Sequence, residues 1–143
     1  MELKDGSSVF IDTAPIIYFI EENPSYSPIV SNLFGKATEG SIEVYTSVIS
    51  VIEVLTKPYK MSRTELVKSY KDFLYQSKGL SVVNINSNIA ELTSKIRAKY
   101  GFRTPDAIQL AVYEYIKCDL FITNDTQLKK YDENKVIVLS EKN

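Results

Sequence analysis

Histidine is absent from this chain of 143 residues, and cysteine occurs only once. Without histidine there can be no Ser-His-Asp triad, no histidine general base and no histidine-ligated metal site. A single cysteine excludes an internal disulfide, a Cys-x-x-Cys redox pair and a zinc ribbon. Only five glycines are present, and none forms a glycine-rich phosphate loop. Catalysis would therefore depend on carboxylates, lysine, tyrosine, hydroxyl groups, or hard cations held by oxygen.

The charges nearly balance, with 17 basic and 18 acidic residues and a net charge of −1. A protein that holds nucleic acid by bulk positive charge is therefore not expected. The apolar runs are far shorter than the ~20 residues that span a bilayer. The polar segment Met1–Ser8 does not resemble a signal peptide. We expect a cytoplasmic protein with no membrane association, and a single domain over residues 1–143.

Short β-branched segments alternate with longer helical patterns along the chain. The predicted strands are Ser8–Ile11, Glu43–Thr46, Leu80–Ile85, Asp119–Thr123 and Val136–Leu139. The predicted helices are Pro15–Ile20, Ile29–Thr38, Val48–Lys57, Ser62–Gln76, Ser87–Tyr100, Thr104–Ile116 and Asp125–Lys130. Such alternation predicts an α/β fold with a parallel sheet that is covered by helices on both faces.

The segment from Val48 to Leu55 is ambiguous, because valine and isoleucine favour strands. Its apolar residues nevertheless fall on one helical stripe, at positions 48, 51, 52 and 55. We therefore predict a helix that ends at Lys57, before Pro58. Glu53 lies inside this apolar helix and is expected to be buried, where a carboxylate needs a partner or a metal ion.

Three further acidic residues are expected at the carboxyl ends of the strands, the edge at which parallel sheets bind ligands. Asp12 follows the first strand, Asp125 follows the strand that ends at Thr123, and Asp106 lies in the first turn of a helix. Local roles also exist for all four acids. Asp12 and Asp125 could cap helices, Asp106 suits a helix dipole, and Glu53 could pair with Lys57.

Taken together, four carboxylates at one edge would repel one another strongly. No single lysine or arginine is placed by the sequence to neutralise all of them. A divalent cation with oxygen ligands would do so, as in Mg²⁺- or Mn²⁺-assisted phosphodiester chemistry. Without a cation, the crowding and burial should raise the pKa of at least one of these carboxylates.

Four short segments resemble the acidic motifs of PIN-domain nucleases, above all the small VapC-type toxins of toxin–antitoxin pairs. The acids in these segments are separated by 41, 53 and 19 positions, and the resemblance extends from about Val9 to Leu139. The segments are Val9-Phe10-Ile11-Asp12-Thr13, Ile49-Ser50-Val51-Ile52-Glu53-Val54, Thr104-Pro105-Asp106-Ala107-Ile108 and Phe121-Ile122-Thr123-Asn124-Asp125.

The resemblance implies a three-layer α/β/α PIN-like fold with a central parallel sheet of about five strands. It implies a metal-dependent endoribonuclease, with Mg²⁺ or Mn²⁺ as cofactor, a cognate antitoxin and a homodimer. The acidic quartet of the family falls on Asp12, Glu53, Asp106 and Asp125 as catalytic residues and metal ligands. Thr13, Thr123 and Asn124 fall on supporting positions.

A single-stranded RNA substrate would need cationic contacts beside the acids. The candidates are Lys57, Lys60 and Arg63 after the Glu53 helix, and Arg97 and Arg103 before Asp106. Three other interpretations stay open: a PIN ribonuclease of RNA processing or decay without an antitoxin, a non-catalytic module that binds RNA or protein, and another hydrolase. A two-carboxylate glycosidase usually needs tryptophan, which is missing. A haloacid-dehalogenase-like phosphatase needs a second aspartate at position 14, which is Ala14.

Overall fold

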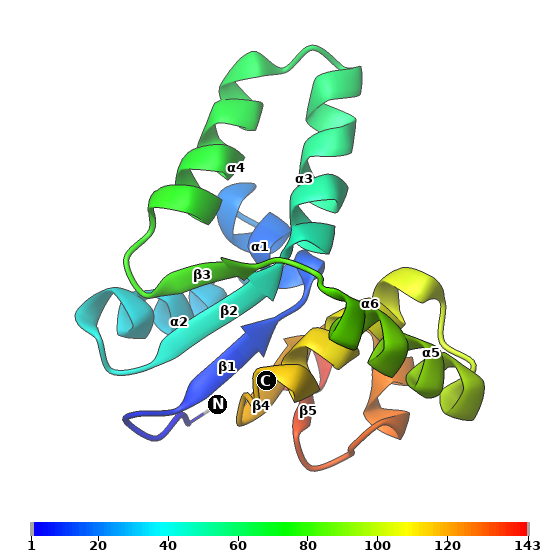
Figure 1. Ribbon diagram of the computed structural model, residues 1–143. Coiled ribbons are helices and arrows are strands. Elements are labelled where there is room, and N and C mark those ends of the chain that lie inside the picture. The colour runs from blue at the N-terminus through cyan, green and yellow to red at the C-terminus, as the bar shows by residue number, and fades with distance from the viewer. Residues whose placement is uncertain (1, 143) are drawn as a thin grey trace.

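The computed structural model describes residues 2–142, which form five strands, six α-helices and two short 3-10 helices (Figure 1). The strands are β1 (Ser8–Ile11), β2 (Glu43–Ser47), β3 (Leu80–Val83), β4 (Leu120–Thr123) and β5 (Val136–Val138). The helices are α1 (Thr13–Ile20), α2 (Ser27–Glu39), α3 (Val48–Lys60), α4 (Thr64–Gln76), α5 (Ser87–Tyr100), α6 (Thr104–Tyr115), η1 (Thr126–Lys130) and η2 (Leu139–Glu141).

All five strands form one parallel sheet in the order β3-β2-β1-β4-β5. In the centre of this sheet, Val9 of β1 is paired with Val44 of β2 on one side and with Leu120 of β4 on the other. The predicted α/β fold with a central parallel sheet is confirmed. The order places the carboxyl ends of β1 and β4 side by side, where Asp12 and Asp125 follow.

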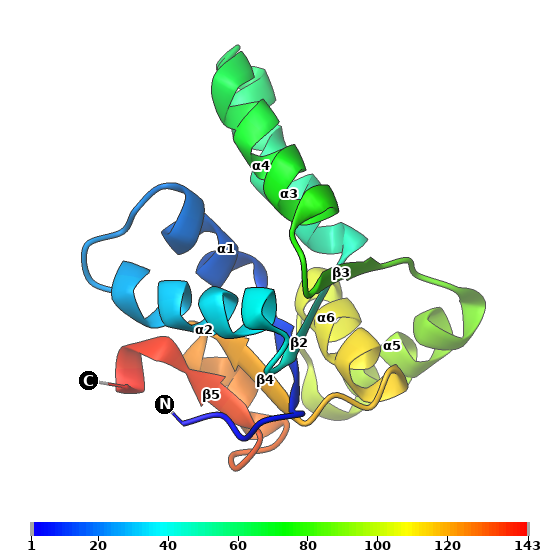
Figure 2. The same ribbon diagram turned by 90° about the vertical axis from the view of Figure 1, so that its left-hand side faces the viewer.

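Helices cover both faces of the sheet (Figures 1 and 2). Alternate residues of β1 point to opposite faces. Val9 and Ile11 pack into the apolar core that contains residues of α1 to α4, whereas Phe10 packs into the core beneath α5 and α6. The Phe10 ring stacks on Phe121 of β4, with 5.3 Å between the ring centres. These two cores fix β1 and β4, and hence the residues that follow them.

Helices α3 and α4 form a hairpin that projects beyond the sheet (Figure 2). The predicted end of α3 at Lys57 is wrong, because the helix continues through Pro58 to Lys60. Proline removes one helical hydrogen bond. The next turn still forms, since Met61 N–H donates to the Lys57 carbonyl and Arg63 N–H to that of Pro58. Within residues 2–142, no helix combines the length and the apolar character needed to cross a membrane.

Candidate active site

A cavity of about 400 Å³ lies at the carboxyl edge of the central strands. We call it the acidic cavity, because the four acids proposed from the sequence all line it, together with the three supporting residues. The lining residues are Asp12, Thr13, Ala14, Ile17, Tyr18, Glu53, Arg103, Asp106, Thr123, Asn124 and Asp125. Segments more than 100 positions apart in sequence therefore meet in one cavity, as their expected places at the ends of parallel strands require.

Asp12 is the most constrained acid of the cavity. One carboxylate oxygen caps α1 by accepting from Thr13 N–H at 2.9 Å, and it also accepts from Gln109 Nε2 at 3.4 Å. The other oxygen accepts from the Thr123 hydroxyl at 2.8 Å. Burial raises the pKa of Asp12, these hydrogen bonds oppose the rise, and the charge of Asp106 adds to it. Asp12 therefore caps α1 and lines the acidic cavity at the same time.

Thr123 connects two of the acids. Its side chain is fully buried at the end of β4. The hydroxyl group donates to Asp12 and accepts from the backbone N–H of Asp125 at 3.1 Å. Asp125 in turn caps η1 by accepting from Gln127 N–H at 3.0 Å. One buried hydroxyl group therefore fixes the position of Asp12 relative to the loop that carries Asp125.

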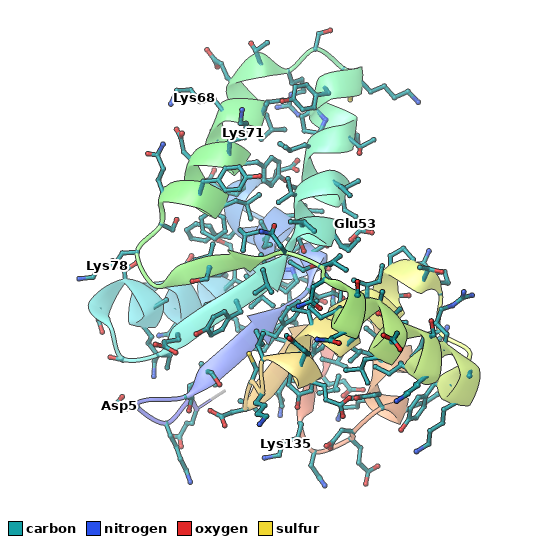
Figure 3. All side chains as sticks on the ribbon, in the orientation of Figure 1. Asp5, Glu53, Lys68, Lys71, Lys78 and Lys135 are labelled. Atoms are coloured by element: carbon teal, nitrogen blue, oxygen red, sulfur yellow. The ribbon has the colours of Figure 1, made fainter. Side chains whose placement is uncertain are left out.

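Glu53 projects from α3 on the side where α6 lies (Figure 3). Its carboxylate accepts a hydrogen bond of 2.6 Å from the Thr13 hydroxyl. The expectation that Glu53 is buried is wrong, because its side chain is exposed. The predicted stripe of α3 is only partly correct: Val51 and Leu55 pack against the core, but Ser50, Val54 and Pro58 are the buried residues and Ile52 is 60% exposed. Sequence alone did not orient this helix, because α3 is apolar on several sides.

Asp106 forms an ion pair within the cavity. Its carboxylate accepts from Arg103 Nε at 3.2 Å, and its side chain is 17% exposed, whereas that of Arg103 is 77% exposed. The hydrogen bond and charge of Asp106 raise the pKa of Arg103, and the charges of Asp125 and Glu53 add to the effect. The guanidinium of Arg103 therefore lies close to three of the acids; the sequence indicated Arg103 as a cation beside the acids but not its ion pair with Asp106.

Asn124 has a structural role beside the cavity. Its side-chain amide donates to the Tyr18 hydroxyl at 2.8 Å, and its side-chain carbonyl accepts from Ser140 N–H at 2.8 Å. These bonds join the loop after β4 to α1 and to η2. Asn124 therefore supports the cavity by fixing the backbone next to Asp125.

The chemistry of the donor set fits a hard dication, since the carboxylates of four acids and the hydroxyl groups of two threonines and a tyrosine line one cavity. Across residues 2–142, however, no three acidic, histidine or cysteine side chains are close enough to form a ready-made cage. Each acid is instead attached to a neighbour within the protein, as described above. A dication would therefore be held directly by some of the carboxylates and through water by the others.

The predicted RNA-binding residues occupy different places. Arg103 lines the acidic cavity itself. Lys57 and Arg63 line an adjoining pocket of about 310 Å³, which shares Ile17 and Glu53 with that cavity. Lys60 is exposed at the end of α3. Arg97 is on α5, and its Nε donates to the Phe102 carbonyl at 3.1 Å. Three of the five candidates therefore lie at or beside the acids.

Sequence reasoning missed a layer of buried polar residues beneath the acids. Gln109 of α6 and the hydroxyl residues Thr46, Ser47 and Ser50 are almost completely buried and bonded to one another. A usable signal was present: Gln109 and Ser50 are polar residues within apolar stretches of helix. A buried polar residue needs hydrogen-bond partners, so such positions indicate a network.

Solved structures share this fold. VapBC from Salmonella typhimurium bound to DNA superposes with a TM-score of 0.74 at 16% identity, covering 93% of this chain and 98% of that one. VapBC2 from Rickettsia felis bound to a promoter DNA fragment gives 0.71 at 14% identity, covering 92% and 98%. VapC20 from Mycobacterium tuberculosis, a toxin that cleaves the sarcin–ricin loop, gives 0.71 at 13% identity, covering 87% and 95%.

No curated protein matches the sequence. The family model described as the PIN domain matches residues 9–134. This is nearly the whole range, from about Val9 to Leu139, over which the sequence resembles PIN-domain nucleases. The match includes all four acids and every strand except the last. The motifs, the five-stranded parallel sheet and the family model agree, and the chain therefore belongs to the PIN domain family.

Proposed function

We propose that this protein is a metal-dependent endoribonuclease that cleaves single-stranded RNA in the acidic cavity. The observation that carries the proposal is the convergence of Asp12, Glu53, Asp106 and Asp125 on one cavity of a PIN domain. The chain has no histidine to act as a base on the 2′-hydroxyl of RNA. Attack by water on phosphorus is therefore the mechanism that the residues support.

In this proposal, Asp12, Asp106 and Asp125 hold one or two Mg²⁺ or Mn²⁺ ions, and Glu53 completes the site or orients the attacking water. A bound dication would lower the pKa of that water and offset negative charge on the scissile phosphate. Thr123 keeps Asp12 in place, and Thr13 does the same for Glu53. Of Asp12 and Glu53, Glu53 is the exposed acid, so its carboxylate can reach a water molecule that arrives with the substrate.

Cationic side chains beside the cavity would hold the RNA backbone. The exposed guanidinium of Arg103 can exchange its bond to Asp106 for one to a substrate phosphate. Lys57 and Arg63 in the adjoining pocket extend the contact surface away from the acids. We propose that Lys60 and Arg97 lie at the outer margin of this contact surface.

We also propose that the chain is the toxin of a toxin–antitoxin pair, with a cognate antitoxin and a second copy of itself as partners. Support comes from the fold, because the similar structures described above are VapBC assemblies or a VapC toxin. Large apolar side chains exposed on the α3–α4 hairpin offer a surface for such partners. They are Ile52, Tyr59, Met61 and Tyr75.

A non-catalytic binding module is the second candidate. Two observations favour it: Arg103 already pairs with Asp106, and no three acids among residues 2–142 form a ready-made cage. A PIN ribonuclease that acts in RNA processing or decay would share the chemistry of the first proposal but need no antitoxin. Cleavage assays separate the first candidate from the second, and co-purification with the product of a neighbouring gene separates the toxin from the processing enzyme.

The test is cleavage of a fluorescent single-stranded RNA by purified protein with Mg²⁺ or Mn²⁺. The proposal predicts cleavage that EDTA abolishes, products with 5′-phosphate and 3′-hydroxyl ends, and loss of activity in Asp106→Asn. Asp72→Asn is the matched control, because Asp72 pairs with Lys68 on the surface of α4, away from the cavity. Binding without cleavage would favour the second candidate, and products ending in 2′,3′-cyclic phosphate would refute attack by water.

A further inference from the structure

Gln109 lies beneath the acidic cavity with every polar group of its side chain in use. It is on α6, three residues after Asp106, and is 1% exposed. Its side-chain oxygen accepts from the Ser47 hydroxyl at 2.5 Å. Its side-chain nitrogen donates to Ser50 Oγ at 2.9 Å and to Asp12 Oδ1 at 3.4 Å. The amide therefore contacts an acid of the cavity while lying outside the cavity lining itself.

The chemistry of the neighbours fixes the orientation of this amide. Ionised Asp12 can only accept hydrogen bonds, so the amide nitrogen must face it. Ser47 Oγ accepts from Ile49 N–H as the cap of α3, which leaves its own proton for the oxygen of Gln109. A flipped amide would place its carbonyl oxygen against the Asp12 carboxylate and lose that hydrogen bond, and the proton of Ser47 would face an N–H donor. Only the observed orientation satisfies all of these groups.

Hydroxyl groups extend the connection from Gln109 to a second acid. Ser50 Oγ, which accepts from Gln109, lies 3.0 Å from Thr13 Oγ1. Thr46 Oγ1 donates to Ser50 Oγ at 2.9 Å, and the proton of Thr13 is donated to Glu53 at 2.6 Å, so the proton between Ser50 and Thr13 comes from Ser50. The donors run in one direction, from Gln109 through Ser50 and Thr13 to Glu53. Asp12 and Glu53 are thus both attached to one amide group.

We propose that Gln109 is a positioning residue of the nuclease site, whose amide sets the Asp12 and Glu53 carboxylates in fixed relative positions. The inference rests on the proposed function and adds a residue to its machinery. Glutamine meets the requirement because one planar group of this length carries two N–H donors and one acceptor. An ionised glutamate lacks the donors, and methionine lacks all three groups. Gln109 acts through Asp12 and Ser50 and does not reach the substrate.

The experiment compares the wild type with Gln109→Met, which keeps the length of the side chain and removes its hydrogen bonds. We expect kcat for RNA cleavage and the affinity for Mn²⁺, measured by calorimetry, each to fall by about 10- to 100-fold, as for other residues that orient metal ligands. KM for RNA should change by less than about twofold, because the residue does not touch substrate.

Thr93→Val is the matched control. Thr93 is 6% exposed on α5 and loses one buried hydrogen bond, to the Ile89 carbonyl, but it does not line the acidic cavity. We expect it to lower the melting temperature without changing kcat or the affinity for Mn²⁺. If Gln109→Met behaves in the same way, its role is merely structural and the proposal is wrong. If Gln109→Met does not fold, Ser50→Ala decides, since it breaks the connection from Gln109 to Glu53, leaves the bond from Gln109 to Asp12 in place and should lower kcat.

A third measurement, an NMR titration, uses only the wild-type protein. In the wild type, Mg²⁺ should shift the side-chain NH₂ resonances of Gln109 in an NMR titration far more than those of exposed Gln76 at the end of α4. If the wild type neither binds a dication nor cleaves RNA, the proposed function fails and this inference fails with it. If the wild type does both and the Gln109 resonances and variant are unaffected, the inference alone fails.

Discussion

Replacement of Thr123 by valine tests whether the buried hydroxyl group stabilises the acidic cavity. The change preserves the shape of the side chain but removes the donor to Asp12 and the acceptor for Asp125 N–H. A hydrogen bond to a charged group contributes about 1.5–3 kcal/mol, and the N–H that loses its partner brings the total to about 2–4 kcal/mol. For a domain of this size, the melting temperature should fall by roughly 6–16 °C.

Thr123→Ser is the comparison, because it retains the hydroxyl group and loses only a buried methyl group, at a cost of about 0.5–1.5 kcal/mol. The assay is urea unfolding at pH 7 in EDTA, followed by circular dichroism. Repeating both substitutions in an Asp12→Asn background should shrink the difference between them, since the charged acceptor is gone. If Thr123→Val is as stable as Thr123→Ser, the hydroxyl group does not hold Asp12 and our reasoning about the cavity is wrong.

Two further predictions concern Asp12 and a close backbone approach. Burial raises the pKa of Asp12, so the folded state binds its proton more tightly than the unfolded state does. Metal-free wild type should therefore lose stability as pH rises from about 4 through the raised pKa, whereas Asp12→Asn should not. A pH series of melting temperatures in EDTA that shows a constant gap between the two proteins would contradict this. Gly79 has φ of +84°, and an added Cβ would lie 2.2 Å from the Ala37 carbonyl oxygen, whereas Gly101, with φ of +74°, has open space. Gly101→Ala should cost about 1–2 kcal/mol for its backbone conformation alone. Gly79→Ala should cost clearly more in urea unfolding, and equal losses would argue against the close contact of α2 with the turn before β3.

The sequence predicted those parts of the site that depend on order along the chain. Asp12 directly follows a strand, Asp125 follows a strand after one intervening residue, and Asp106 follows a proline at the start of a helix. In a parallel sheet these places share one edge, so their convergence could be inferred without coordinates. The alternation of strand and helix patterns along the chain also predicted a parallel sheet, which the structure confirms.

The parts that depend on side-chain direction were not predictable in this way. Helix α3 is apolar on more than one side, so periodicity alone correctly assigned Val51 and Leu55 to the core but wrongly assigned Ile52 and Glu53 to it. The ion pair of Arg103 with Asp106 depends on the conformation of a long, exposed side chain. Gln109 reaches Asp12 across 97 positions of sequence, a contact that exists only once α6 packs against the sheet.

Calorimetric titration with Mn²⁺ most directly examines the claim that the four acids form one metal site. Wild type and Asp72→Asn are expected to bind with equal affinity. Asp106→Asn is expected to bind at least about tenfold more weakly, since it removes one of the carboxylates that would neutralise the ion. The account is contradicted if the wild type releases no heat of binding, or if Asp106→Asn binds Mn²⁺ as tightly as the wild type does.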